Sequence, residues 1–259
     1  MKVFQYWDTG EPPEDVAACI QSVRDLNPRF DHWFFDHARA ARFIGDFVGH
    51  REAAAFASLA IPAMQADYFR LCALTAKGGW WIDADDLCRQ PIRTLLRENP
   101  AAGAYASMRD NLLTNPVLFA RTPGNPFFSA CLELATRRIE ARTEGRATDV
   151  TGGLVLNLVW AAADAEGAHE DPHRARDPAF ETTEEARAVV SRHPGIETAL
   201  SVLERRHQLW TEQALIGVRE LSYKSTSRDW RHWPSEVYLD ATCTPAPAGA
   251  DHDRDGRGS

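Results

Sequence analysis

Three carboxylates stand within four positions at the end of an apolar run. Trp80-Trp81-Ile82 is followed by Asp83, Ala84, Asp85 and Asp86. In an extended chain alternate side chains point to the same side, which puts Asp83 and Asp85 ~6.5 Å apart along one side of the strand. Carboxylate oxygens suit Mg²⁺ or Mn²⁺, ions that keep open positions for phosphate oxygens. The pair could therefore hold one divalent cation, and we assign Asp86 to the turn that follows.

A plain turn is the alternative interpretation of this acidic run. Aspartates are common in turns, and one of them could cap a following segment. The apolar run before them favours a site, because it would partly desolvate the carboxylates. They would then repel one another unless a cation or hydrogen bonds compensated.

A second charged pair, Asp67 and Arg70, stands three positions apart in a stretch with helical spacing, so the two side chains share a face. Leu71 and Leu74 continue that face. The pair could be an intrahelical ion pair worth about 0.3 kcal/mol. It could also be a carboxylate that binds a substrate hydroxyl beside a guanidinium that binds phosphate. These residues alone leave both interpretations open.

The elements around these residues predict an α/β fold. Residues 3–7 read as a strand, the stripe Val16, Ile20, Val23 and Leu26 as a helix, and 30–35 as a second strand. Strand, helix and strand in this order favour a largely parallel sheet. In such sheets ligands bind outside the carboxyl ends of the strands, where Asp83 and Asp85 would lie.

Later segments extend the same pattern as one domain. We expect helices at 38–60, from Pro62 to Gly78, at 126–142 and at 153–163, strands at 80–82, 101–107 and 117–121, and a loop at 166–183. The domain is expected to span residues 1–243. Residues 244–259 lack the apolar side chains needed to order themselves, so we expect a disordered tail.

Composition narrows the class of protein. The chain has 259 residues, 44% of them hydrophobic, enough for a sizeable core. Lys and Arg number 29 against 37 Asp and Glu, a net charge of −8, which argues against a nucleic-acid-binding protein. The five cysteines are scattered and read as reduced thiols. With no secretory signal and no run of ~20 apolar residues, we expect a cytoplasmic protein without a membrane span. It could work peripherally at the inner membrane face if its acceptor is lipid-linked.

Taken together, three stretches resemble the sugar-binding glycosyltransferases that carry a DXD motif. They are Ala66-Asp67-x-x-Arg70, Gly78-Gly79-Trp80-Trp81-Ile82-Asp83-Ala84-Asp85 and Phe4-Gln5-Tyr6-Trp7. The resemblance is to glycosyltransferase family 32 and its capsular-polysaccharide-synthesis and clostridial-toxin-like relatives. Flanking matches include Asn115-Pro116 and Thr151-Gly152-Gly153, so the resemblance covers roughly residues 3 to 155 in the family's order.

This resemblance implies a GT-A-type fold, with a Rossmann-like mixed sheet flanked by helices in a single domain that carries C-terminal decorations. It also implies a hexosyltransferase that uses a UDP- or GDP-sugar donor. The sugar would be transferred with retention at the anomeric carbon, with the help of Mn²⁺ or Mg²⁺. The acceptor would be a saccharide, a lipid-linked molecule or a natural product.

The resemblance also suggests roles for individual residues. Trp7 would stack on the nucleotide base, although it could equally be an ordinary core tryptophan. Asp67 and Arg70 would hold sugar hydroxyls and the diphosphate. Asp83 would contact ribose, sugar or metal, and Asp85 would be the principal metal ligand.

Three positions depart from the family's pattern, whereas Asn115 matches it and is expected to shape the sugar or acceptor pocket. Trp81 replaces a tyrosine and so lacks its hydroxyl. Near the C-terminus Lys224 takes the place of a histidine, and Asp229 that of a serine before Trp230. Lys224 could offset diphosphate charge, but it cannot ligate a metal while protonated. Trp230 and Trp233 could be packing residues.

Two other functions remain as alternatives. A haloacid-dehalogenase-type phosphatase also uses Asp-x-Asp after an apolar strand, but it needs Thr or Val where this chain has Leu87, and its motif lies near the N-terminus. A non-catalytic module that binds nucleotide sugars is the second alternative, suggested by Lys224.

Overall fold

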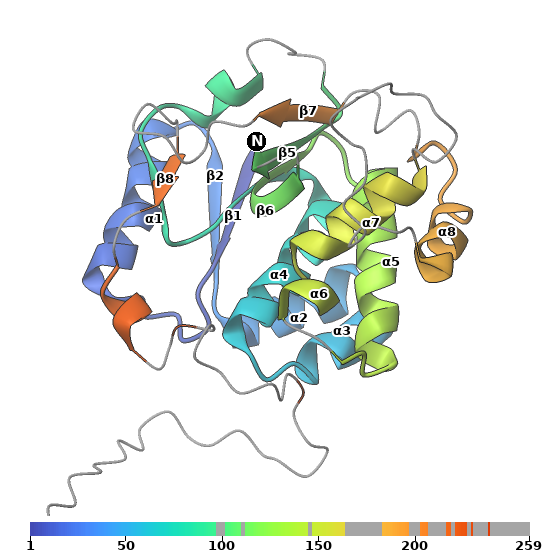
Figure 1. Cartoon of the computed structure of the whole chain (residues 1–259). Coiled ribbons are helices and arrows are strands. Elements are labelled where there is room, and N and C mark those ends of the chain that lie inside the picture. The colour runs from blue at the N-terminus through green and yellow to red at the C-terminus, as the bar shows by residue number, and fades with distance from the viewer. Residues whose placement is uncertain are drawn as a thin grey trace, which may run out of the picture.

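The computed structural model describes most of the chain (Figure 1). The described residues are 1–96, 102–109, 112–144, 147–163, 183–196, 203–206, 216–218, 221–226, 229 and 238. In chain order the elements of the first half are β1 (Lys2–Tyr6), α1 (Glu14–Leu26), β2 (Asp31–Phe35), α2 (His37–Phe47), α3 (His50–Ala57), α4 (Pro62–Lys77), β3 (Gly79–Ile82), β4 (Asp86–Cys88) and the 3₁₀ helix η1 (Ile92–Leu96). Those of the second half are β5 (Ala104–Arg109), β6 (Leu112–Ala120), α5 (Pro126–Glu140), α6 (Ala147–Val150), α7 (Gly153–Ala163), α8 (Glu184–Val190), β7 (Leu203–Arg206), β8 (Ile216–Val218) and the 3₁₀ helix η4 (Ser222–Ser225).

One mixed sheet organises the fold. Its strands lie in the order β2-β1-β3-β6-β5-β7, and β4 pairs with β8 in a separate two-stranded sheet. β1 runs parallel to β2 and β3, whereas β6 runs antiparallel to β3 and β5. The predicted α/β class and mixed sheet are confirmed. The expected parallel pairing holds for β2, β1 and β3 and for β5 with β7, whereas β6 is antiparallel to both of its neighbours. β5 and β6 are close in sequence, which allows them to pair as antiparallel strands.

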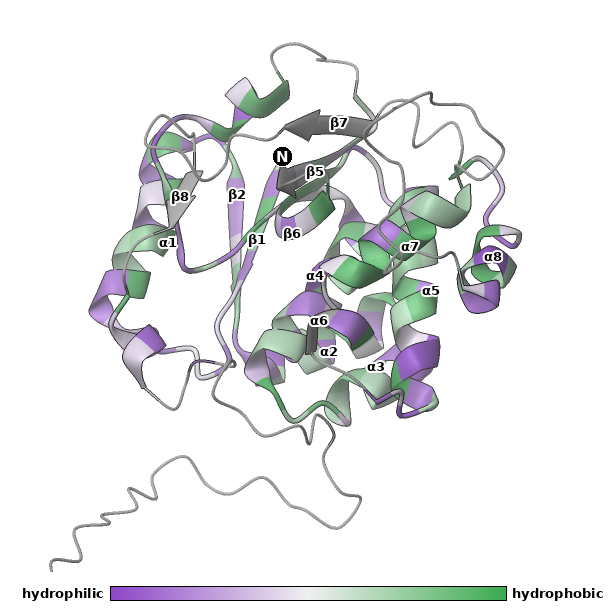
Figure 2. Cartoon of the chain, in the orientation of Figure 1, coloured by the Kyte–Doolittle hydropathy of each residue, from purple (hydrophilic) through white to green (hydrophobic). Residues whose placement is uncertain are grey.

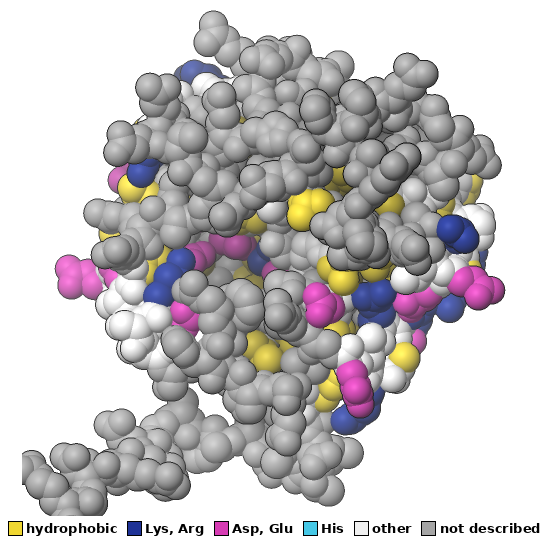
Figure 3. Space-filling model, in the orientation of Figure 1, with side chains coloured by type: hydrophobic (Ala, Val, Ile, Leu, Met, Phe, Trp, Pro, Cys, Tyr) yellow, Lys and Arg dark blue, Asp and Glu magenta, His cyan; other side chains and the backbone are white. Residues whose placement is uncertain are grey.

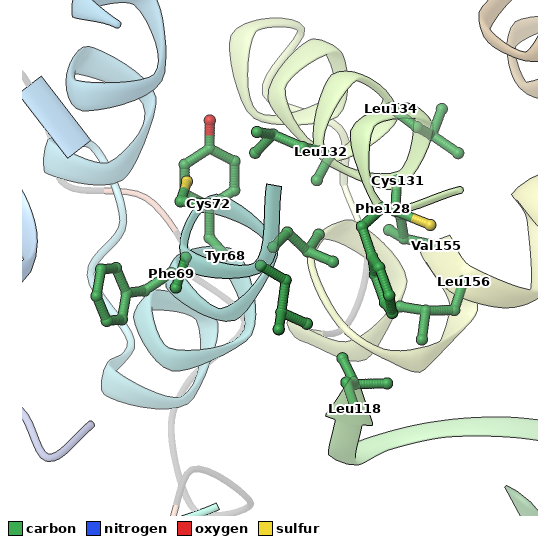
Figure 4. Close-up of a cluster of buried hydrophobic side chains, with 14 of the residues drawn as sticks. Tyr68, Phe69, Cys72, Leu118, Phe128, Cys131, Leu132, Leu134, Val155 and Leu156 are labelled. Carbon is green, nitrogen blue, oxygen red and sulfur yellow. The ribbon is translucent and has the colours of Figure 1, made fainter. Parts of the chain in front are cut away.

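Helices cover both faces of this sheet (Figure 1). On one face Trp81 packs with α4, α5 and α7, and Figure 4 shows side chains of these helices meeting Leu118 of β6. On the other face Trp80 and Ile82 pack with Val23 of α1 and with η1. Alternate residues of β3 thus enter two different cores, as expected for a strand buried on both sides. Figure 2 shows α7 as largely hydrophobic, in keeping with its burial.

The predicted helix boundaries follow their capping signals. Pro62 opens α4 and Gly78 caps its end, while the side chain of Asn125 caps α5 by accepting hydrogen bonds from Phe127 N and Phe128 N. Gly79 then adopts a φ of +104°, and a Cβ there would lie 2.7 Å from the carbonyl oxygen of Lys2. Glycine is therefore required where β3 begins beside β1.

Other boundaries differ from the prediction. The helical region predicted at 38–60 is two helices, α2 and α3, interrupted at Val48-Gly49. β6 begins at Leu112 rather than 117, because the buried amide of Asn157 bonds both backbone groups of Leu113 and so extends the strand toward its start. The short elements β4, α6, α8, β7, β8, η1 and η4 were not predicted, since few residues mark them in the sequence.

Several predictions concern residues outside the described part. The loop at 166–183, except Thr183, the end of the domain at 243, the tail at 244–259, and Trp230 and Trp233 all lie there. Among the helices that are described, none combines the length and apolar character needed to cross a bilayer.

Candidate active site

The predicted site residues gather at one edge of the sheet. The carboxyl ends of β1 and β3 and the amino-terminal part of β6 meet there, because β1 and β3 are parallel and β6 is antiparallel to β3. Trp7 follows β1, Asp83 follows β3, and the backbone N–H of Asp83 donates to Pro116 O of β6 at 2.9 Å. Figure 3 shows acidic and basic side chains close together near the middle of the visible face.

Arg70 is the buried centre of this arrangement, with only 3% of its surface exposed. One guanidinium nitrogen lies 2.9 Å from Asp67 Oδ1 and 2.9 Å from Asp83 Oδ1. The other donates to the carbonyl oxygen of Asn115 at 2.6 Å. The predicted Asp67–Arg70 ion pair exists, but it is buried and extends to Asp83, so it is not an isolated pair on a helix surface. Removing one partner of a buried pair costs about 3–5 kcal/mol.

Asp67 and Asn115, two residues predicted to contact the donor sugar or to shape its pocket, are hydrogen-bonded to each other. The amide Nδ2 of Asn115 donates to Asp67 Oδ1 at 2.7 Å. Burial raises the pKa of Asp67, against the opposing influence of Arg70 and Asn115. The structure therefore brings together three predicted residues, Asp67, Arg70 and Asn115, from α4 and β6.

Trp81 explains one of the departures from the family's pattern. Its indole Nε1 donates to Asp83 Oδ1 at 2.7 Å, and its ring lies 5.1 Å from the guanidinium carbon of Arg70. The indole N–H thus supplies a hydrogen bond although the tyrosine hydroxyl is missing. Burial raises the pKa of Asp83 to about 7, with Asp85 adding to the effect and Arg70 opposing it.

Asp85 is held from a different part of the chain. Its Oδ2 accepts a hydrogen bond from the hydroxyl of Tyr223 at 2.7 Å and lies 3.0 Å from Lys224 Nζ. Asp83 therefore contacts Arg70 of α4, whereas Asp85 contacts η4. β3 ends at Ile82 and the N–H of Asp86 donates to Asp83 O, so a turn rather than an extended strand positions the two carboxylates.

Asp86 serves the turn through its backbone, as predicted, because its N–H donates to Asp83 O. It is also the first residue of β4, which pairs with β8, and only 5% of its surface is exposed. Burial raises the pKa of Asp86 well above its usual range, and Asp85 and Asp83 raise it further.

Trp7 lies between the two interpretations offered for it. It is partly buried in a small cluster with Val16, Ile20 and Leu221, and its ring meets that of Tyr223 edge-on at 5.2 Å. Its indole nitrogen is buried without a hydrogen-bond partner in the described part of the chain. The ring thus borders the site through Tyr223, and stacking on a base remains a prediction.

The donor set of the site fits a hard divalent cation that takes further ligands from a substrate. Asp83 uses Oδ1 and Asp85 uses Oδ2 for the contacts above, and the described residues supply no hydrogen bond or ion pair to the second oxygen of either. No group of three or more His, Cys, Asp or Glu suited to a metal occurs among the described residues. Two carboxylates with substrate phosphates are a usual environment for Mg²⁺.

Sequence reasoning missed Tyr223 and its support. Ser222 donates its backbone N–H to Asp15 Oδ2 and its hydroxyl to Asp15 Oδ1, which ties η4 to the first turn of α1. Only the Lys224 position drew attention to this segment from the sequence, and Tyr223 beside it could have been found by the same signal.

Comparison with known proteins finds a family model that matches part of the N-terminal half of the chain. Residues 13–102 match the model of the glycosyltransferase sugar-binding region containing the DXD motif. The chain is 25% identical over 164 residues, 61% of its length, to inositol phosphoceramide mannosyltransferase 2 of Schizosaccharomyces pombe. It spans 45% of the length of that relative.

Solved structures with a similar arrangement share little sequence with the chain. PaToxG glycosyltransferase is 13% identical with a TM-score of 0.47, over 76% of this chain and 85% of that one. The galactosyltransferase LgtC, in complex with donor and acceptor sugar analogues, is 15% identical with a TM-score of 0.40, over 91% and 93%. The segment that matches the family model, the glycosyltransferase sugar-binding region containing the DXD motif, carries Asp67, Arg70, Asp83 and Asp85.

Proposed function

We propose that the chain is a metal-dependent, retaining glycosyltransferase that moves a hexose from a UDP- or GDP-sugar to an acceptor. The observation that supports it best is the buried Arg70, which holds Asp67 and Asp83 together inside the segment that matches the family. The mixed sheet with helices on both faces agrees with the GT-A-type fold that the family resemblance implies. A mannosyltransferase among the relatives favours a hexose donor.

Each donor group has a residue to meet it in this proposal. Trp7 stacks on the base. Asp67, fixed by Arg70 and Asn115, accepts hydrogen bonds from sugar hydroxyls through its second oxygen. Lys224 meets the diphosphate as a cation. Asp83 and Asp85 would hold Mn²⁺ or Mg²⁺ through the oxygens to which the described residues make no hydrogen bond or ion pair.

The chemistry follows from where charge develops. Breaking the anomeric C–O bond leaves its electron pair, and thus one further negative charge, on the departing nucleoside diphosphate. A bound divalent cation would neutralise part of that charge directly. Arg70 is buried behind Asp67 and Asp83, so it acts by fixing both carboxylates and by placing a permanent positive charge beneath the reacting groups. A retaining transfer of this type needs no obvious protein base.

The acceptor is a saccharide, a lipid-linked molecule or a natural product in this proposal. A protein that transfers to a lipid-linked acceptor would work at the cytoplasmic face of a membrane. Vesicle flotation with the full chain distinguishes such a peripheral protein from a freely diffusing cytoplasmic one.

An Asp85→Asn variant tests the proposal. It keeps the shape of the side chain and removes the charge that would hold the cation. We expect Mn²⁺-stimulated release of nucleotide from the preferred donor, in a panel of UDP- and GDP-sugars, to fall at least about 100-fold. The control is Asp46→Asn, at an exposed position of α2, which should leave the rate unchanged.

The same panel separates the alternative functions. A phosphatase would prefer phosphomonoesters to nucleotide sugars, and Leu87, which lies in β4, is neither the Thr nor the Val that its motif needs. A non-catalytic module would bind a nucleotide sugar without releasing nucleotide. The Lys224–Asp85 contact is the observation that favours such a module. Unchanged release in Asp85→Asn would rule out the proposed role of Asp85.

A further inference from the structure

The ammonium group of Lys224 contacts Asp85, the residue that would bind the divalent metal ion in the proposed function. Lys224 Nζ lies 3.0 Å from Asp85 Oδ2, and the hydroxyl of Tyr223 donates to that same oxygen. Both side chains of the ion pair are 24% exposed, so the pair is neither deeply buried nor freely solvated. Asp85 is thus already neutralised by a residue of the chain.

The backbone holds Lys224 beside Asp85. The backbone N–H of Lys224 donates to the carbonyl oxygen of Leu221, a residue only 4% exposed. Ser222, which follows Leu221, donates its own N–H to Asp15 of α1. The ring of Tyr223 packs against Trp7. The ammonium group is carried on a flexible four-carbon stem, so it can change partners while η4 stays in place.

We propose that Lys224 is the resident counter-ion of Asp85, which a divalent cation displaces and which then pairs with the diphosphate of the donor. This inference rests on the proposed function and deepens it. Lys224 would make the affinities for metal and for nucleotide diphosphate depend on each other. Lysine in place of the family's histidine would then make the binding of the metal depend on the binding of the nucleotide.

Lys224 and a divalent cation compete for Asp85 because both are positively charged. An ammonium and a dication cannot both approach Asp85 without repelling each other, so Lys224 weakens the binding of metal alone. A nucleoside diphosphate brings negative charge that attracts both cations, and it gives Lys224 a new partner. Metal and nucleotide should therefore each strengthen the binding of the other, and by thermodynamic linkage the factor is the same in both directions.

The test measures free Mn²⁺ by electron paramagnetic resonance in titrations of the full chain, alone and with UDP or GDP. Lys224→Met keeps much of the stem and removes the charge. We expect it to bind Mn²⁺ alone about tenfold or more tightly than the unmodified chain. It should also lose most of the mutual strengthening between Mn²⁺ and the nucleotide.

Three further variants make the result specific. Lys224→Arg keeps the charge and should keep the weak binding of Mn²⁺ alone. Lys77→Met removes a lysine whose ammonium lies 3.3 Å from the ring of Phe47, away from the site, and should change nothing. Lys224→Gln repeats the loss of charge with a polar side chain, in case Lys224→Met is poorly folded.

The outcomes separate this inference from the proposed function. If the charge-removing variants bind Mn²⁺ no more tightly than the unmodified chain, Lys224 does not compete for Asp85 and the inference is wrong, even where nucleotide sugars are turned over. If Mn²⁺ binding tightens but no nucleotide binds, the competition stands and the glycosyltransferase proposal fails. If no variant binds Mn²⁺ with or without nucleotide, both fail.

Discussion

Arg70 shows how one residue sets the geometry of several others. Its guanidinium reaches two carboxylates and a main-chain carbonyl, and it lies over the ring of Trp81. Arginine suits this position because its planar group makes several hydrogen bonds in a fixed arrangement and stacks on aromatic rings. Arg70 therefore makes contacts that suit an arginine, although it is almost fully buried.

Asn115 offers a test of this cluster. Replacing it by leucine removes the amide that donates to Asp67, and we expect a loss of about 1–3 kcal/mol in the free energy of unfolding. Urea denaturation measures the change. Gln21→Leu is the matched control, because the Gln21 amide donates to Asp25 at the same 2.7 Å but on an exposed helix face. A similar loss in both variants would contradict a special role for burial.

The sequence predicted one half of the site better than the other. Asp67 and Arg70 are neighbours in one helix, and Asp83 follows soon after, so spacing and strand order sufficed to place them together. Asp85 meets Tyr223, which lies 138 residues later, and no periodicity connects the two. The donation from Trp81 to Asp83 was also missed, since it depends on where the strand ends.

Among the elements, the junction of α5 with the residues after α8 depends on a single acid. The carboxylate of Glu133 accepts hydrogen bonds from Arg137, Arg192 and His193. Burial would raise the pKa of Glu133, but the hydrogen bonds from these three residues outweigh it and lower the pKa to about 2. The folded protein therefore favours the ionised form.

This gives a prediction with a definite pH range. A lowered pKa stabilises the fold fully above the ordinary value of 4.5 and ceases to do so as the pH falls toward 2. Glu133→Gln should cost on the order of 1–3 kcal/mol near pH 7, and the difference from the unmodified chain should shrink below pH 4.5. Chemical denaturation at several pH values measures it.

Glu140→Gln is the control for that experiment. Glu140 pairs with Arg51 in a two-point contact, but both side chains are nearly half exposed. Such pairs contribute about 1 kcal/mol or less. If Glu140→Gln cost as much as Glu133→Gln, partial burial would not explain the stronger effect at the junction.

The elements that sequence reasoning found are those with strong local signals. Pro62 and Gly78 mark the two ends of α4, and the helix predicted from 126 begins there as α5. The elements that it missed take their shape from partners instead. β4 exists because it pairs with β8, and β6 is extended by Asn157.

At the scale of the whole molecule, the binding of a nucleotide should raise the thermal stability of the folded protein. A ligand that binds only the folded state stabilises it by about 2.7 kcal/mol at a hundred times its Kd. For a chain of this size that corresponds to a rise of roughly 5–10 °C in Tm. We expect either UDP or GDP, but not both equally, to raise Tm, and Mn²⁺ to enlarge the rise.

The Asp85→Asn variant provides the comparison for that measurement. It should keep a Tm close to that of the unmodified chain without ligands and lose the enlargement by Mn²⁺. A shift that is equal for both nucleotides and independent of Mn²⁺ would instead point to unspecific binding of the diphosphate. Thermal melts of both proteins under identical conditions give the answer.

The separation of Asp85 from Tyr223 along the chain also has a consequence during biosynthesis. Ribosomes add about 5–20 residues per second, so roughly 7 to 30 seconds pass between the synthesis of Asp85 and that of Tyr223, which lies 138 residues later. The residues that contact Asp67, which are Arg70 and Asn115, have all been synthesised much earlier, once the ribosome has added Asn115. The nascent protein should therefore form the Arg70 cluster before the contact between Asp85 and Tyr223.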